Sequence, residues 1–470
     1  MKPKKELETT LLIKEEFGTS YQKILKYFYP EFITALIIYS LPQFIDFYFI
    51  CHLKQTNLYA ISGIVENFLT MFTKSAEGLL IGTVVISGYF NGLHEYKKAG
   101  QSFVDAFWTT ITTGFCVSLL LYFGVSAFYR FNNFTPEMVQ LGTPYLQIKA
   151  VGVFFLFFYF ALVGFFRAVK NTFTPMVVFA IGSSVFVLCD YLLIYGSFGF
   201  PRLGLLGSAV SYLIQYIVMS VLMLVYLAYA VKYKKYDISF VSHCCNKDRI
   251  IKFLYISFPV VLDKISIAFA YVWLASCISQ SGTNASAAFS MLKQMERLAF
   301  IPAIAFSQII TFLVSNDLGN GKWDDIFANI KRVVYIASIM VGVILVVGSI
   351  WPTFFASMYG CAPEICYLVA IVFPPLSILV MFDLLQLILS GALRGAGDVQ
   401  TVMKTRIAVI AGYFIPITYV ISFLNLQDVG TKMLVTYAAF LIGNGLMSIV
   451  YIIRLRQSHF KKQNVKVMHG

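Results

Sequence analysis

Residues 382–398 read Phe-Asp-Leu-Leu-Gln-Leu-Ile-Leu-Ser-Gly-Ala-Leu-Arg-Gly-Ala-Gly-Asp. The stretch begins within an apolar run that carries one carboxylate, Asp383, and Gln386 follows one helical turn later on the same face. It ends in a glycine-rich polar turn that runs from Arg394 to Asp398. An ionisable side chain in hydrocarbon costs at least ~2.5 kcal/mol, so an acid inside a membrane span indicates a functional site.

The polar turn has a counterpart earlier in the chain. Arg394 and Asp398 match Arg167 and Asn171 at a spacing of 227 positions. Other pairs at spacings of 227 to 229 positions are Thr174 and Thr401, Met176 and Met403, Pro30 and Pro259, and Asn91-Gly92 and Asn320-Gly321. Several matches at one spacing indicate a duplicated half.

The composition is that of a membrane protein. Hydrophobic residues make up 59% of the 470 residues, charged residues make up 13%, and the mean hydropathy is +0.76. Apolar runs of about 20 residues, the length that crosses ~30 Å of hydrocarbon, recur throughout. We therefore predict an all-α polytopic membrane protein with twelve transmembrane helices in two six-helix lobes, related by a parallel internal repeat. The expected spans are 27–51, 60–88, 103–128, 143–167, 175–198, 204–231, 250–278, 286–315, 328–357, 364–391, 404–424 and 431–453.

The basic residues predict the orientation. Outside the spans, all Lys and Arg residues except Lys54, Arg130, Arg202 and Lys432 fall on the side of the two termini, so both termini are expected in the cytoplasm. This bias accounts for the net charge of +13 through contact with the anionic inner leaflet, without any nucleic-acid partner. We expect a monomer in the plasma (inner) membrane. Its expected parts are a cytoplasmic N-terminal segment (1–26), an N-lobe (27–231), a basic cytoplasmic linker (232–249), a C-lobe (250–453) and a basic cytoplasmic tail (454–470).

Two acids in the N-lobe are predicted to lie at similar depth. Asp46 follows Pro42 by four residues, just beyond an expected kink in the first span. Asp190 lies about fourteen residues into its span, or ~21 Å at 1.5 Å per residue. Both positions correspond to the outer half of the membrane. The two acids are therefore expected to share one outward-facing cavity.

Other polar side chains gather on helix faces. The second span carries a stripe on one face that consists of Glu66, Thr70, Thr73, Lys74 and Glu77. The stripe either lines a cavity or forms a charge cluster that pins helices together. The eighth span has a shorter counterpart, Lys293, Glu296 and Arg297, followed by Gln308. The aromatic run 154–160, which includes Tyr159, either packs against lipid and protein or forms a π-rich wall for flat cations.

These residues together resemble the multidrug and toxin extrusion (MATE) family. The stretches that carry the resemblance are 166–176, Asp190-Tyr-Leu-Leu-Ile, Gly-Phe-Pro-Arg-Leu-Gly at 199–204, Ser-Asn-Asp-Leu-Gly-Asn-Gly-Lys at 315–322, and Asp383 to Gly395. The resemblance covers roughly residues 27–453. It implies a V-shaped pair of six-helix lobes that export amphipathic, often cationic compounds against inward H⁺ or Na⁺, with no cofactor.

The resemblance also implies roles for individual residues. Asp46 and Asp190 match the acids of an ion-coupling pair in the N-lobe. Asp383 and Asp263 match acids of the C-lobe. With the polar and aromatic residues described above, the candidate substrate- or cation-binding residues are Asp383, Gln386, Asp263, Glu66, Lys74, Glu77, Gln308 and Tyr159. Arg167, Asn171, Arg394 and Asp398 match cytoplasmic motif turns. Phe186 and Tyr212 stand where the family usually has Asn and Thr, and the loss of these oxygens disfavours Na⁺ at the N-lobe pair.

The expected mechanism follows from electrostatic competition. A carboxyl group away from water favours its protonated form, whereas an organic cation favours the ionised form. A proton and a cation that compete for one charge are exchanged by linkage.

Three alternatives to this reading remain open. A flippase for a lipid-linked oligosaccharide or polysaccharide precursor would explain Lys74, Lys149 and Lys264 within spans, because buried cations suit a pyrophosphate. A major-facilitator carrier is disfavoured because residues 91–98 lack the Gly-x3-Asp-Arg-x-Gly-Arg loop. An enzyme is disfavoured because the chain carries no phosphate-binding loop, no metal-spaced His/Cys set and no nucleophile–base pairing.

Overall fold

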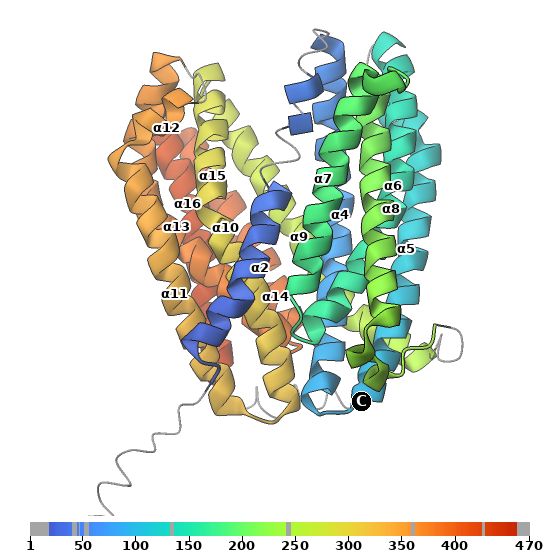
Figure 1. Cartoon of the computed structure of the whole chain (residues 1–470). Helices are drawn as coiled ribbons and strands as arrows, with labels where there is room; N and C mark the ends of the chain where they lie inside the picture. The colour runs from blue at the N-terminus through green and yellow to red at the C-terminus, as the bar shows by residue number, and fades with distance from the viewer. Residues whose placement is uncertain are drawn as a thin grey trace, which may run out of the picture.

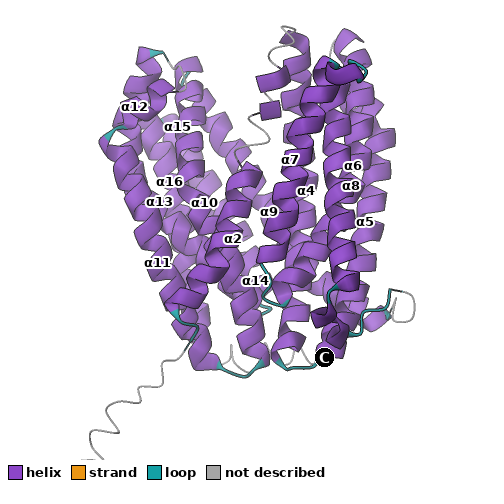
Figure 2. Cartoon of the chain, in the orientation of Figure 1, coloured by secondary structure: helices purple, strands orange, loops and turns teal. Residues whose placement is uncertain are grey.

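The computed structural model describes residues 18–39, 45–46, 48–50, 56–131, 136–240, 246–358, 362–424 and 428–457. These residues are almost entirely helical and include no strand, which confirms the predicted all-α class (Figure 2). The first eight elements are α2 (Tyr21–Tyr39), α4 (Thr56–Gly92), α5 (Tyr96–Phe131), α6 (Pro136–Ala168), α7 (Phe173–Tyr195), η1 (Ser197–Gly199), α8 (Leu205–Tyr229) and η2 (Val231–Tyr236). The second half contains α9 (Lys247–Ser279), α10 (Thr283–Gly319), α11 (Trp323–Ile350), α12 (Pro352–Met358), α13 (Pro363–Gly395), α14 (Val399–Val409), η3 (Ile410–Phe414), α15 (Ile415–Phe423) and α16 (Val429–Arg456).

Eleven helices within the described residues are long and apolar enough to cross a membrane. They correspond to the second to twelfth predicted spans. The first predicted span, 27–51, begins earlier than expected, because α2 starts at Tyr21. Pro42 and the kink expected there fall outside the described residues, while positions 45–46 and 48–50 beyond it are helical.

The helices form two bundles arranged as a V (Figure 1). The N-lobe consists of α4 to α8, and the C-lobe consists of α9 to α16. The bundles meet near the loops that follow α4 and α10, which we call the tight end, and diverge toward the opposite, open end (Figure 1). The helix α2 belongs to the first half in sequence but lies between the bundles, packed on both α10 and α7.

The tight end is held by a close backbone contact between α4 and α10. A Cβ atom on Gly92 would overlap the backbone oxygen of Asn316, and one on Gly319 would overlap the backbone oxygen of Tyr89. Gly92 and Gly319 are 227 positions apart, and so are Tyr89 and Asn316, so the contact has the two-fold symmetry of the repeat. Asn91 Nδ2 also donates a hydrogen bond to Asn316 Oδ1 at 2.7 Å.

The start of α2 is tied to the C-lobe. The backbone N–H of Gly18 donates to Asp325 Oδ1 at 2.6 Å, at the start of α11. About two turns into the helix, the Phe28 ring stacks on Phe306 of α10, with centroids 4.3 Å apart. This segment therefore connects both lobes at the tight end.

Each half pins the arginine of its motif turn to an acid near the proline of its first helix. Arg167 donates to Glu31 through Nε at 2.8 Å and Nη2 at 2.6 Å, the bidentate geometry that strengthens such pairs. In the second half, Arg394 Nη2 lies 2.5 Å from Asp263 Oδ2, and Arg406 binds the other Asp263 oxygen. We expected Asp263 to bind cations. In this structure arginines hold both of its oxygens and the residue is buried, so cation binding at Asp263 stays a prediction.

The residue four positions after each arginine is fixed in the same way in both halves. Asn171 Nδ2 donates to the Tyr233 hydroxyl at 2.6 Å, and Asp398 Oδ2 accepts from Arg454 Nε at 2.7 Å. Each also bonds the threonine three residues further on, at 2.8 and 2.7 Å respectively. The two motif turns are therefore held by equivalent hydrogen bonds at the tight end of each lobe.

The α4–α10 contact leaves no room for a side chain, so Gly319→Leu is expected to lower the free energy of unfolding by about 1–3 kcal/mol. Gly342→Leu on α11 is the matched control, since no atom lies within 4 Å of a Cβ there. The measurement is thermal unfolding of the purified protein in detergent. Equal melting temperatures for the two variants would contradict the close contact.

Asp263→Asn is expected to destabilise the chain by about 3–5 kcal/mol, because it leaves two buried guanidinium groups without a counter-charge. Asp237→Asn serves as the control, since Asp237 is exposed and lies 3.6 Å from Lys97 at the surface. Folded yield by size-exclusion chromatography and the melting temperature are the readouts. A wild-type melting temperature for Asp263→Asn would show that the two arginines do not need this acid.

Candidate functional site

The structure brings Asp46 and Asp190 together inside the N-lobe. Both residues are buried, Asp190 completely, in contrast to the expected open cavity. Their carboxyl groups interact electrostatically with each other, and the Ser208 hydroxyl of α8 lies beside Asp46. Among the described residues, both Asp190 oxygens and Asp46 Oδ1 still lack a hydrogen bond of ordinary geometry. A buried polar group without such a bond is costly, so the pair is a candidate functional site.

A lysine lies next to the acid pair. Lys149 projects from α6, its side chain is 2% exposed, and its ammonium pairs with the carboxylate of Glu66 on α4. The ammonium also lies over two aromatic rings, 5.2 Å from the Tyr145 centroid and 4.7 Å from the Tyr212 centroid. Cation–π attraction extends to about 6 Å, so both rings stabilise the buried charge.

The polar stripe on α4 divides into two parts. Glu66 turns to Lys149 within the N-lobe, whereas Lys74 pairs with Glu77 at 2.7 Å further along the helix. Glu77 also lies 3.5 Å from Lys264 on α9, so this part of the stripe crosses to the C-lobe. The two threonines of the stripe, Thr70 and Thr73, bond backbone carbonyls of their own helix. The stripe therefore connects the two lobes through Glu77 and leaves the Glu66 carboxylate partly exposed.

The C-lobe contains a second caged lysine. Lys293 of α10 pairs with Glu296 at 3.0 Å, and its ammonium lies 3.9 Å from the Tyr271 centroid and 5.5 Å from the Tyr437 centroid. The Tyr437 hydroxyl donates to the same glutamate. Asp383 interacts electrostatically with this pair.

Asp383 itself is held by a neighbouring helix. Its Oδ1 accepts a hydrogen bond from Asn444 of α16 at 3.0 Å. Gln386, one turn further along α13, is buried beside Tyr451. These two candidates therefore lie within the C-lobe, apart from the acid pair of the N-lobe.

Two further candidates are not part of either cluster. Tyr159 is buried in the N-lobe core, where its ring packs near Phe179 and Tyr216. This favours the packing alternative for the aromatic run over the π-rich wall. Gln308 is half-buried on α10.

Sequence reasoning missed the partners of the charged residues. Tyr145, Tyr271, Tyr437 and Asn444 come from helices far apart in the sequence, and no local spacing identifies them. One signal was present, because Glu66 and Glu296 are 230 positions apart, close to the repeat spacing. Aligning the two halves along the whole chain would have paired these two glutamates.

The oxygen atoms around the acid pair come from the two carboxyl groups and the Ser208 hydroxyl. Phe186 and Tyr212 replace the expected oxygen donors. Phe186 is a buried apolar side chain, and the Tyr212 ring faces the Lys149 ammonium. Sodium, a hard cation, needs several oxygen ligands, by analogy with calcium and magnesium. Within the described residues, no group of three His, Cys, Asp or Glu side chains could hold a metal ion.

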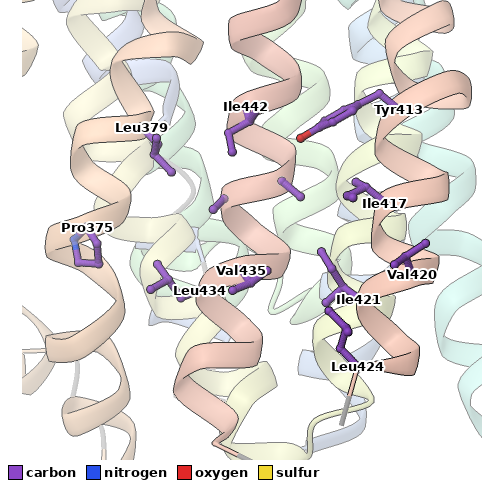
Figure 3. Close-up of a pocket in the computed structure, with 12 residues that line it drawn as sticks. Pro375, Leu379, Tyr413, Ile417, Val420, Ile421, Leu424, Leu434, Val435 and Ile442 are labelled. Atoms are coloured by element: carbon purple, nitrogen blue, oxygen red, sulfur yellow. The ribbon is translucent and has the colours of Figure 1, made fainter. Parts of the chain in front are cut away.

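A groove of about 590 Å³ opens in the C-lobe between α13, α15 and α16 (Figure 3). Its lining is almost wholly apolar, and Val420 and Ile442 are well exposed. Tyr413 is the one titratable residue among those that line it. Such a surface is typical of contact with hydrocarbon, so this groove is not the candidate site for charged groups.

Comparison with known proteins places the chain in context. The MatE family model matches residues 32–192 and 259–420, one segment in each half. The probable multidrug resistance protein NorM of Bacillus anthracis is 22% identical over 414 residues, which cover 86% of this chain and 89% of that protein. The probable multidrug resistance protein YoeA of Bacillus subtilis is 23% identical over 61% of this chain and 63% of its own length.

Solved structures share the fold. A crystal structure of MATE in the bent conformation superposes with a TM-score of 0.84 at 18% identity and covers 94% of this chain and 96% of that one. An outward-facing multidrug resistance MATE family transporter of the MOP superfamily gives 0.84 at 17% identity, with 95% and 96% covered. Since the family model matches more than half of the residues, in both lobes, this chain belongs to the MatE family of membrane transporters.

Proposed function

We propose that this transporter exports organic cations in exchange for protons, and that its two lobes rock about the α4–α10 contact. The observation that carries the proposal is the buried Asp46–Asp190 pair. Two carboxyl groups side by side in a low dielectric cannot both ionise at little cost, so at least one holds a proton. A site that faces each side of the membrane in turn can load that proton outside and release it inside.

We further propose that the tight end lies at the cytoplasmic face, with both termini in the cytoplasm. The motif-turn arginines Arg167 and Arg394 lie there, as does Arg454 in the last turn of α16, which agrees with the positive-inside rule. The structure then corresponds to the state that is open to the outside. Operation as a monomer in the plasma membrane remains part of this proposal.

Protons are favoured over sodium as the coupling ion. Phe186 and Tyr212 replace two oxygen donors that would complete a sodium site at the N-lobe pair, and Lys149 already places a positive charge beside it. A metal ion would meet repulsion from this ammonium. A proton, by contrast, neutralises one carboxyl without any further ligand.

Cationic substrates are favoured by the polar stripe of α4. Glu66 is 40% exposed and Glu77 lies on the same helix face, so carboxylates line the side of the N-lobe that turns to the C-lobe. Relatives in Bacillus and Yersinia are named multidrug resistance proteins. We therefore propose a broad range of amphipathic cations as substrates.

The flippase alternative rested on lysines within spans. Each of these lysines has a carboxylate partner, since Lys149 pairs with Glu66, and Lys74 and Lys264 share Glu77. Compensated lysines offer little attraction to a pyrophosphate group. This pairing supports the cation exporter over the flippase.

Asp46→Asn and Asp190→Asn are each expected to abolish proton-driven export while leaving folded protein, because an amide cannot exchange a proton. Asp324→Asn, which replaces an exposed acid at the start of α11, is the control and should transport normally. The measurement is ethidium efflux from proteoliposomes with equal amounts of each protein. Full activity in both N-lobe variants would contradict the proposal.

An imposed proton gradient alone is expected to drive ethidium efflux, and an imposed sodium gradient alone is expected to leave it at the rate of empty liposomes. The two gradients are applied separately to the same preparation. Sodium-driven efflux would contradict the assignment of the N-lobe pair and direct attention to Asp383. The absence of efflux with either gradient, together with accumulation of a lipid-linked glycan in a deletion strain, would favour the flippase.

A further inference from the structure

Lys149 is the feature that the proposed exchange leaves unexplained. Its ammonium is buried and paired with Glu66, and it also interacts electrostatically with both aspartates. Burying a lysine without a counter-charge is very costly, so the ammonium must always have one carboxylate partner. The residue has a choice of partners that lie on different elements.

Glu66 is the partner that faces outward. The eleven positions between Glu66 and Glu77 correspond to about three full helical turns, so both side chains leave α4 in nearly the same direction. Glu77 reaches Lys264 of the C-lobe, which fixes that direction as toward the other lobe. With 40% of its side chain exposed, Glu66 can accept a second cation from the open end of the V.

The aspartates are the partner that faces inward. The charged and titratable groups around them are Glu66 on α4, Tyr145 and Lys149 on α6, and Cys189 and Tyr195 on α7. The helix α8 contributes the Ser208 hydroxyl. Among the residues that the structure describes, Lys149 is the one cation in this set. If it leaves Glu66, the carboxylates of this set that can balance it are an ionised Asp46 or Asp190.

The balance of charge then connects the state of Glu66 to that of the Asp46–Asp190 pair. With Lys149 on Glu66 and a proton on each aspartate, the cluster is neutral. An organic cation that takes Glu66 frees the lysine, and the cluster is neutral again only when one aspartate gives up its proton. The four-carbon stem and three donors of a lysine suit such a change of partner.

The C-lobe offers an internal comparison. The Lys293 ammonium of its Lys293–Glu296 pair also lies over two tyrosine rings, here Tyr271 and Tyr437. The Glu296 side chain, however, is only 7% exposed, and the Tyr437 hydroxyl already donates to it. A substrate cation cannot reach that glutamate without breaking the contact. The exposed glutamate is thus specific to the N-lobe.

We propose that Lys149 is a tethered counter-cation that links the binding of an organic cation at Glu66 to the loss of one proton from the Asp46–Asp190 pair. The inference rests on the proposed proton exchange and adds its coupling element and its ratio. Lys149 acts as a positioning residue, since it touches neither the substrate nor the transferred proton.

The test measures protons released per ethidium bound by the purified full-length protein in weakly buffered detergent solution, with a pH-indicator dye. The wild type is expected to release about one proton per ethidium. Lys149→Met is expected to bind ethidium at the open Glu66 and to release none, whereas Lys98→Met, at an exposed lysine paired with Glu95, behaves as wild type. Lys149→Gln replaces the methionine variant if that variant does not fold.

The outcomes separate the two proposals. Release of one proton by either Lys149 variant, or loss of ethidium binding in both, would overturn the role of Lys149 and leave proton exchange standing. Binding to the wild type without proton release would overturn the linkage itself. Proton-driven efflux by Asp46→Asn and Asp190→Asn would instead refute the underlying exchange, whatever Lys149 does.

Discussion

The cost of burying charge away from water governs this structure. An ion placed in a low-dielectric interior loses its hydration, so every buried ion pair must be complete or the fold is destabilised. Arg394 and Arg406 meet on Asp263, and Lys293 meets Glu296. Lys293 and Glu296 lie one turn apart on α10, whereas the two arginine–Asp263 pairs connect helices from distant parts of the sequence. They determine which helices are neighbours as firmly as the apolar packing does.

The exceptions to this rule mark the residues whose charge or ion-pair partner can change. Asp46 and Asp190 are buried together without a full set of hydrogen bonds among the described residues. Glu66 is the member of a buried ion pair that remains substantially exposed. The incomplete and the accessible groups lie next to each other in one lobe. A transporter needs such a place, because binding can shift an equilibrium only where a group has two states of similar free energy.

The sequence predicted the helices better than their partners. Apolar runs of membrane-spanning length identified the class, and the matched turns at Arg167 and Arg394 identified the repeat, because both signals are local. The partners of Asp263 were missed, since nothing near it in the sequence reveals that Arg394 and Arg406 converge on it. The pairing of Lys149 with Glu66 was missed for the same reason. Contacts across 83 or 131 positions depend on how whole helices pack.

The contact of Gly92 and Gly319 has a mechanical consequence. Most helix interfaces interlock, because side chains of one helix fill the hollows of the other and must be withdrawn before the helices part. Where Gly92 and Gly319 let the backbones approach, no side chain at these two positions stands between the helices. In the rocking motion proposed above, these two positions can act as a pivot, because no side chain there has to be withdrawn.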